Sequence, residues 1–250
     1  MSTRGQNRSD PPDAARLEVS VVIPAYNESG MIERATADVV DGLRARGLGF
    51  EVVVVENGST DDTRARVERI AARDTEVTVR TLAQPDYGEA LRTGLLAARG
   101  RWVVIFDADY YDLGFLDRAL SRMGVDPRPA IVVGSKRAPG TRDDRAWVRR
   151  AITAAFAALL RVGFGLRVSD THGMKVLDRD AVTPLARRCR SGRDLFDTEL
   201  VLRADRAGLP VIELPVTVVE RRPSRTPIVG RALRTGVGLV GLRLALWRES

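Results

Sequence analysis

Four short runs of apolar, β-branched residues alternate with amphipathic segments in the first part of the chain, and this order permits few folds. The runs lie at 17–24, 50–56, 77–82 and 102–106. Nearly continuous apolar runs of this length predict strands that are buried on both faces, and the third run predicts a weaker strand. Strands that alternate with helices predict a parallel sheet with helices on both sides.

Polar residues at the start of each intervening segment predict where the helices begin. We expect Asn27 or Ser29 to cap the first helix, and Ser59 or Thr60 to cap the second. A third helix is expected from about residue 88 to residue 99, where Gly100 follows it.

The second half is less regular. Strands are expected at 130–134 and at 211–219, and helices at 147–161 and 195–207. The 147–161 helix is predicted to be amphipathic, with its large apolar side chains on one side: Val148, Ile152, Phe156, Leu159 and Leu160.

The two ends differ in charge from the rest of the chain. Residues 1–16 are polar without an apolar core, which predicts a disordered leader rather than a signal peptide. The chain has a net charge of +7, and its last 30 residues hold seven arginines and one acid, Glu249. We expect residues 226–250 to form a basic, apolar helical segment, at a membrane surface or at a homo-oligomer contact.

Charge and composition also narrow the class of partner. The basic segment lacks interleaved aromatic residues, so phosphates or an anionic membrane surface are favoured over nucleic acid. No run of about 18 apolar residues occurs, so no membrane-spanning helix is predicted. The single cysteine, Cys189, fits a reducing compartment such as the cytoplasm.

Polar residues follow each of the four predicted strands at the point where the strand ends. Ligands bind beyond the carboxyl ends of strands in open parallel sheets. The fourth strand runs directly into Asp107-Ala108-Asp109. An Asp-x-Asp pair is common, but this one closes an ordered series of strand ends. Two carboxylates there can hold a hard divalent cation, Mg²⁺ or Mn²⁺, which neutralises a diphosphate leaving group.

These strand ends together resemble a known enzyme family. PAYNE, ENGSTDDT, YGEALRTGLLAARG and FDAD are similar to the inverting glycosyltransferases of family 2, which have the GT-A fold. Later segments, GSK, VSDTHGMK, FDTELVLRADRAGLPVIELPV and RRPSR, resemble the dolichyl- and polyprenyl-phosphate sugar synthases of that family. The resemblance implies an α/β, Rossmann-like, mostly parallel sheet flanked by helices over residues 17–225. Residues 17–112 would bind the nucleotide sugar and residues 113–225 the acceptor.

The resemblance also implies which residues bind the donor. Residues expected to line the base, ribose and diphosphate are Pro24, Ala25, Tyr26, Glu28, Glu56, Asn57, Asp86, Gly88 and Arg92. Asp107 would meet the ribose and sugar, with Ala108 between it and Asp109, the firmer metal ligand. The family usually has two aspartates where Glu56-Asn57 stands, so the base, in a UDP- or GDP-sugar, stays open.

On the acceptor side, the resemblance implies a second group of residues. Residues expected to bind the acceptor or its phosphate are Ser135, Lys136, Asp170, His172, Arg222, Ser224 and Arg225. Glu199 would face the reaction centre. Tyr111 stands where related synthases often have Gln, which leaves the third metal ligand open; His172, the chain's one histidine, is a candidate alongside Asp107 and Asp109.

The sequence therefore predicts a metal-dependent glycosyltransferase that moves a sugar from a nucleoside diphosphate to polyprenyl phosphate, at the cytoplasmic face of the plasma membrane. A phosphate acceptor is already ionised and needs no strong base. A hydroxyl acceptor, the first alternative, requires a carboxylate base, for which Asp197 and Glu199 are candidates. A non-catalytic nucleotide-sugar-binding protein is the second alternative.

Overall fold

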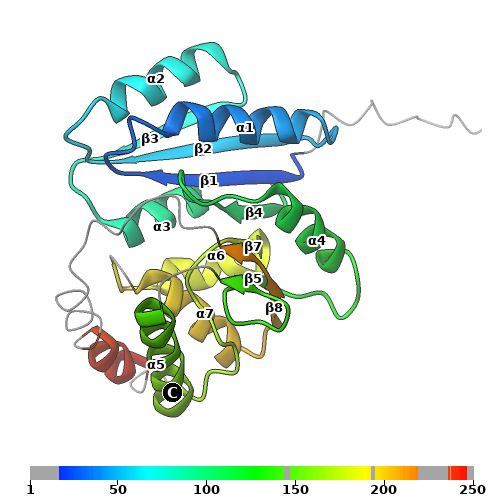
Figure 1. The fold of residues 1–250 in the computed structure, drawn as a ribbon, viewed down its shortest axis with the longest axis vertical. Coiled ribbons are helices and arrows are strands. Elements are labelled where there is room, and N and C mark those ends of the chain that lie inside the picture. Colours follow the sequence, from blue (N-terminus) through cyan, green and yellow to red (C-terminus); the bar gives the residue numbers. More distant parts are fainter. Residues whose placement is uncertain (1–16, 144–146, 193–194, 219–235, 237, 247–250) are drawn as a thin grey trace, which may run out of the picture.

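A seven-stranded mixed sheet forms the centre of the molecule (Figure 1). The computed structural model describes residues 17–143, 147–192, 195–218, 236 and 238–246. The strand order is β3-β2-β1-β4-β7-β5-β8. The strands are β1 (Val19–Ala25), β2 (Phe50–Asn57), β3 (Val77–Leu82), β4 (Trp102–Ile105), β5 (Ile131–Ser135), β7 (Lys175–Asp178) and β8 (Val211–Pro215), while β6 (Arg142–Asp143) and β9 (Thr217–Val218) pair separately.

The four strands predicted in the first half are confirmed, and all their pairings are parallel. The sequence did not predict β7, which lies antiparallel between β4 and β5. Its four residues, Lys175–Asp178, are too few for a clear periodic pattern. Because β7 pairs with both β4 and β5, one sheet supports the strands of the first half and β5 of the second half.

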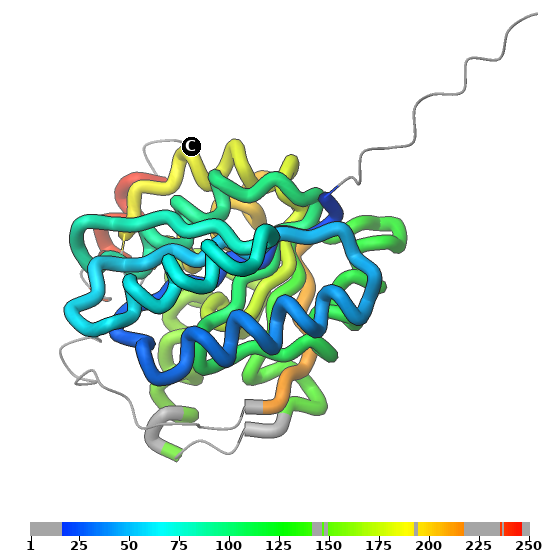
Figure 2. Tube along the Cα trace, turned by 90° about the horizontal axis from the view of Figure 1, so that it is seen from above, coloured from blue at the N-terminus to red at the C-terminus, as the bar shows by residue number. Residues whose placement is uncertain are grey.

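Helices cover both faces of this sheet. They are α1 (Ile32–Arg44), α2 (Thr63–Arg73), α3 (Tyr87–Ala97), α4 (Leu113–Met123), α5 (Trp147–Phe164), α6 (Arg179–Arg188) and α7 (Phe196–Arg206). Apolar residues of α1, α2 and α4 pack on one face, and those of α3, α6 and α7 on the other. Figure 2 shows α1 and α2 side by side over the sheet, where Arg66 forms an ion pair with Glu33.

The predicted caps of the first two helices are wrong. α1 begins at Ile32 and α2 at Thr63, and neither has a side-chain cap. The four polar residues proposed as caps lie in the preceding loops, where tertiary hydrogen bonds engage the side chains of Asn27 and Ser59. The third helix does have a side-chain cap, because Asp86 accepts a hydrogen bond from the Glu89 backbone N–H.

Helix α5 is the least covered helix. Leu160 is buried in the core, and Phe156 packs against it, as expected for an inward face. Ile152 and Leu159 are 39% and 50% exposed, so the predicted single apolar face is divided between core and surface. The amphipathic prediction is therefore only partly right, because the outer side is apolar as well.

A further helical stretch, residues 238–246, packs beside α5 (Figure 1). Its Leu239, Leu242 and Leu246 are buried in the same core as α7. Arg243 donates a hydrogen bond to the Gly163 carbonyl at the end of α5. None of the helices described reaches the length and apolar character needed to cross a membrane. The predicted leader and residues 219–235 lie outside the described residues.

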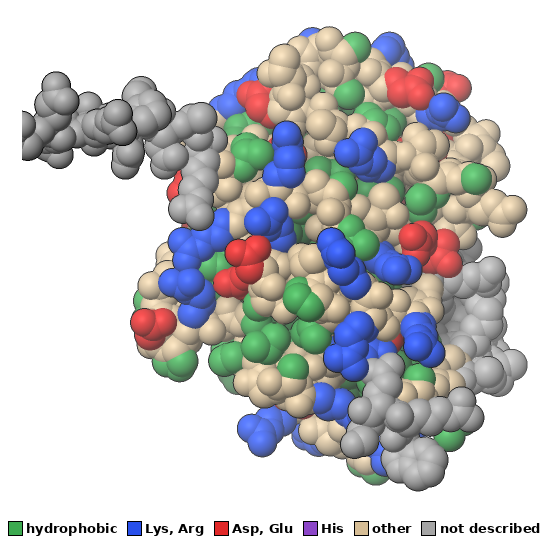
Figure 3. All heavy atoms as spheres, turned by 180° about the vertical axis from the view of Figure 1, so that it is seen from behind, with side chains coloured by type: hydrophobic (Ala, Val, Ile, Leu, Met, Phe, Trp, Pro, Cys, Tyr) green, Lys and Arg blue, Asp and Glu red, His purple; other side chains and the backbone are tan. Residues whose placement is uncertain are grey.

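Side chains of both charges occur on the face of the molecule that Figure 3 shows. On the face shown in Figure 3, Lys and Arg side chains are interspersed with apolar ones and with fewer Asp and Glu. Several arginines are paired, as in the bidentate contact of Arg46 with Asp117.

Candidate active site

The loops after β1 and β2 are held together by side chains at the carboxyl end of the sheet. Asn27, which has a positive φ of 54°, donates its backbone N–H to Ser59 Oγ and accepts the Thr60 N–H on Oδ1. The Glu28 N–H donates to Thr63 Oγ1 at 2.8 Å. Hydrogen bonds thus join the polar residues at the ends of β1 and β2, which the sequence predicted to lie close together.

Glu56 and Asn57 lie deeper and are nearly inaccessible, at 2% and 4% exposure. Glu56 Oε1 accepts the Ser59 N–H at 2.6 Å, and Asn57 Oδ1 accepts the Asp86 N–H at 2.8 Å. Gly58 has a φ of 66°, and a Cβ there would lie 2.9 Å from the Gln84 backbone. The Glu56-Asn57-Gly58 turn therefore ties the ends of β2 and β3 together; a contact of Glu56 with the base stays a prediction.

Asp107 and Asp109 lie on a tight turn directly after β4. The backbones of Asp107 and Tyr110 exchange two hydrogen bonds of 3.1 Å, which folds the segment back on itself. Tyr87 at the start of α3 donates its hydroxyl to Asp107 Oδ1 at 2.9 Å. Burial, and next the charge of Asp109, raise the pKa of Asp107 from 3.8 to about 6.

This pair of carboxylates fits a hard divalent cation. Burial of Asp107 and the neighbouring charge of Asp109 both disfavour its ionised form, and Lys136 offsets only part of this, as its raised pKa shows. A cation between them removes that cost, and oxygen ligands suit Mg²⁺ and Mn²⁺. Among the described residues no group of three His, Cys, Asp or Glu side chains is arranged to hold a metal ion. Donor phosphate oxygens and water would complete the coordination.

Mn²⁺ affinity is expected to fall as the pH is lowered through about 6. A protonated Asp107 cannot bind the metal, so the loss below that pH approaches about tenfold per pH unit. In the metal-free protein the sign is opposite: the contribution of Asp107 to stability is fully present below pH 3.8 and is lost as the pH rises through about 6. Calorimetric titration with Mn²⁺ from pH 5 to 7.5 measures the affinity. An affinity independent of pH in wild type, or a dependence unchanged in Asp107→Asn, contradicts this prediction.

In the second half of the chain, Asp170 connects the loop after β5 with the loop before β7. It is 7% exposed, and its two carboxylate oxygens accept the backbone N–H groups of Lys136 and His172. Lys136 follows β5 and places Nζ 5.5 Å from the centroid of the Tyr110 ring. Its charge also lowers the pKa of Asp107, so a cation from the second half of the chain lies near the aspartate pair.

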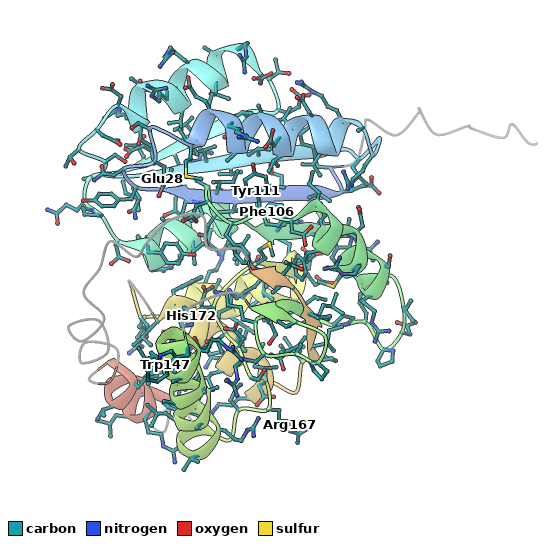
Figure 4. The ribbon with its side chains drawn as sticks, viewed as in Figure 1. Glu28, Phe106, Tyr111, Trp147, Arg167 and His172 are labelled. Atoms are coloured by element: carbon teal, nitrogen blue, oxygen red, sulfur yellow. The ribbon has the colours of Figure 1, made fainter. Side chains whose placement is uncertain are left out.

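His172 faces α5 (Figure 4). Its ring makes an edge contact with Phe156, with 5.5 Å between centroids, and Nδ1 lies 3.2 Å from Thr171 Oγ1. The structure does not bring His172 into a three-residue metal cluster with Asp107 and Asp109. Acceptor binding by His172 and its loop, residues 170–173, which we call the acceptor loop after the predicted role, stays a prediction.

Glu199, which the resemblance predicts to face the reaction centre, makes its contacts within α7 and with the segment before that helix. It is 1% exposed; Oε1 pairs with Arg203 at 2.8 Å, and Oε2 accepts the backbone N–H groups of Arg190 and Ser191. These contacts engage both oxygens. Asp197, two residues earlier on α7, is one of the residues whose charge raises the pKa of Asp107.

Three remaining predictions have separate outcomes. The Tyr111 hydroxyl donates to Asp38 of α1 at 2.6 Å and packs beside Phe106, which gives it a structural contact away from the turn (Figure 4). Arg92 lies on α3, 3.5 Å from Glu89. The predicted phosphate-binding residues lie outside the described residues: Arg222, Ser224 and Arg225.

The comparison with known families tests the predicted family of this chain. The model of glycosyl transferase family 2 matches residues 20–184. The chain belongs to glycosyltransferase family 2. The predicted family and enzyme class are therefore confirmed.

Curated relatives extend over most of this glycosyltransferase. It is 33% identical over 230 residues to glycosyltransferase AglD of Haloferax volcanii, covering 89% of this chain and 36% of AglD. It is 26% identical over 261 residues to the dolichyl-phosphate beta-glucosyltransferase of Saccharomyces cerevisiae, covering 96% and 78%. A third match, 32% identical over 213 residues, is an uncharacterized glycosyltransferase of Mycobacterium tuberculosis, covering 85% and 90%. The chain thus spans about a third of AglD but most of the other two.

Solved structures share the fold of this glycosyltransferase. Glucosyl-3-phosphoglycerate synthase from Mycobacterium tuberculosis in complex with phosphoglyceric acid has a TM-score of 0.67, covering 91% of this chain and 79% of that one at 22% identity. The same enzyme with Mn²⁺, UDP-glucose and phosphoglyceric acid has a TM-score of 0.66, with the same coverage and identity. The predicted mostly parallel α/β fold is confirmed.

Proposed function

We propose that this glycosyltransferase moves glucose from UDP-glucose to a polyprenyl phosphate at a membrane surface, with Mn²⁺ or Mg²⁺ at the aspartate pair. The names of the yeast relative and of the solved structures support this sugar, donor and metal. The metal would neutralise the diphosphate as it leaves. A phosphate oxygen of the acceptor would attack the anomeric carbon while the bond from that carbon to the UDP oxygen breaks.

The outer surface of α5 is the observation that carries the choice of acceptor. Six of the nine large exposed apolar side chains of the described residues lie on α5 or on residues 238–246, so they form a local surface: Trp147, Ile152, Leu159, Val162, Val240 and Leu244. We call this set the α5 surface. The inner side of α5 contacts His172 in the acceptor loop. A membrane bound at the α5 surface would therefore lie next to the acceptor loop.

Charge near the α5 surface favours a lipid bilayer over a second copy of this basic chain. Helix α5 holds the exposed Arg150 and Arg161 and no acidic residue, and Arg243 lies at its end. Apolar side chains among arginines suit insertion at an anionic membrane surface. We propose that this contact is with the cytoplasmic face of the plasma membrane. We propose no nucleic-acid partner for the protein.

The acidic residues near the site also favour a phosphate acceptor. A hydroxyl acceptor needs a carboxylate free to take its proton. Glu199 is engaged by Arg203 and two backbone N–H groups, and Asp197 lies 3.0 Å from Lys175 Nζ. An acceptor that arrives ionised needs no such base, and Lys136 offers it a positive charge.

The test uses the full chain with a panel of UDP- and GDP-sugars and Mn²⁺. The acceptor is polyprenyl phosphate in vesicles containing anionic lipid, with the matching polyprenol as control. Transfer from UDP-glucose to the phosphate and none to the polyprenol is expected. Transfer only to a soluble hydroxyl acceptor overturns the acceptor assignment, and a preference for a GDP-sugar overturns the donor assignment.

The same assay tests the α5 surface. The double variant Leu159→Glu, Val162→Glu alters side chains that are 50% and 88% exposed, so the fold is expected to persist. Vesicle binding and transfer to lipid are expected to fall at least about tenfold, because two charges replace apolar groups in the membrane interface. UDP-glucose binding serves as the internal control. If the double variant binds vesicles as wild type does, the proposal that the α5 surface contacts the membrane is wrong.

A further inference from the structure

A buried ion pair lies between the donor and acceptor halves of the site. Lys175 is fully buried at the start of β7. Its Nζ lies 3.0 Å from Asp197 Oδ1 and donates a hydrogen bond of 2.9 Å to the Gly173 carbonyl. A buried ammonium is costly unless it is paired, so this ion pair and this hydrogen bond stabilise its charge there.

The position of Lys175 in the sheet is central to the site. It pairs with Ile105 of β4 on one side, two residues before Asp107. On the other side it pairs with Val133 of β5, two residues before Ser135. Lys175 thus lies between the strand that delivers the aspartate pair and the strand that delivers Ser135 and Lys136.

Both partners of Lys175 belong to elements around the site. Gly173 lies in the acceptor loop with a φ of 124°, and a Cβ there would be 3.3 Å from the Gly134 carbonyl, so this loop passes close to the end of β5. Asp197 is 3% exposed in the first turn of α7, where the helix dipole favours a negative charge. Its charge is among those that act on Asp107.

We propose that Lys175 is a positioning residue that fixes the Asp197 carboxylate and the Gly173 carbonyl between the aspartate pair and the acceptor loop. The inference rests on the proposed function and extends it to the internal support of the site. Lys175 touches neither substrate in this account. It keeps the acceptor loop and α7 in a fixed position relative to the turn that holds Asp107 and Asp109. Displacement of a positioning group by about 1 Å is enough to lower the rate about 10²-fold.

The experiment compares three variants, Lys175→Met, Asp197→Asn and the double variant. Each single change is expected to lower kcat for transfer about 10²-fold, while the Kd for UDP-glucose changes less than about threefold. Because Lys175 acts through Asp197, the double variant is expected to lose about 10²-fold rather than the product of the two losses. Removing both charges also avoids an unpaired buried charge, so the double variant is expected to fold if Lys175→Met does not.

Glu51→Gln is the matched control, since Glu51 is a buried carboxylate paired with Arg99 near the amino end of β2, at the opposite end of that strand from Glu56 and Asn57. It is expected to lower the melting temperature and leave kcat unchanged. Wild-type kcat in the double variant, or losses that multiply, overturns the role of Lys175. Wild-type protein that transfers sugar from no donor overturns the proposed function and this inference with it.

Discussion

Replacing Asp109 with Asn is expected to lower kcat about 10³-fold, because the metal would lose its charged ligand at the turn after β4. The amide keeps the size of the side chain, so the fold is expected to persist. Asp107→Asn is expected to be similarly severe. This residue also accepts the Tyr87 hydroxyl, so its loss disturbs the start of α3 as well.

The measurement separates metal binding from folding. Sugar transfer is followed against Mn²⁺ concentration in wild type and in Asp109→Asn, together with the melting temperature of each protein. Glu68→Gln, which changes an exposed carboxylate on α2 paired with Arg64, is the control and should retain full activity. If Asp109→Asn keeps the wild-type kcat at the same Mn²⁺ concentration, the proposal that the metal binds at the aspartate pair is wrong.

The first half of the fold was predictable because β1, β2 and β4 are buried along their whole length and mostly apolar. Their order alone implied that the four strand ends meet, and Asn27, Asn57 and Asp107 do meet there through hydrogen bonds with neighbouring loops. Helix α4 was not predicted, although the sequence contains a helix signal there: Asp112 caps the helix, and Phe115, Leu116 and Ala119 recur on one face. Helix α6 is less readable, because Pro184 interrupts its pattern.

The acceptor half was harder to predict because its key contacts join residues far apart in the sequence. Nothing local to Lys175 indicates that it meets Asp197 across the fold. Glu199 is a different case. Arg203 stands four residues after it on the same helix, the spacing at which ion pairs form. That spacing was a sequence signal for a structural role, and the family resemblance directed attention elsewhere.

The second prediction with a large expected effect concerns the stability that the Glu199–Arg203 ion pair provides. Arg203→Met is expected to lower the free energy of unfolding by about 3–5 kcal/mol, because it leaves a buried carboxylate without its counter-charge. For a chain of this size, that corresponds to a melting temperature lower by about 10 °C. Differential scanning calorimetry without ligand measures the change.

The same pair is expected to influence donor binding indirectly. Glu199 holds the backbone N–H groups of Arg190 and Ser191, and the next residue, Gly192, passes so close to Asp86 that a Cβ there would lie 2.7 Å from Oδ2. Loosening this loop moves a wall of the predicted nucleotide pocket. Arg203→Met is therefore expected to raise KM for UDP-glucose several-fold while kcat of the folded protein stays within about threefold of wild type.

Glu199→Gln is the matched variant, because its amide oxygen can still accept the loop hydrogen bonds while the charge is removed. It is expected to raise KM less than Arg203→Met does. A loss of kcat of about 10²-fold or more in folded Glu199→Gln, with KM unchanged, would instead make Glu199 a catalytic base. That outcome would favour a hydroxyl acceptor over a phosphate, since only a hydroxyl needs its proton removed during the attack.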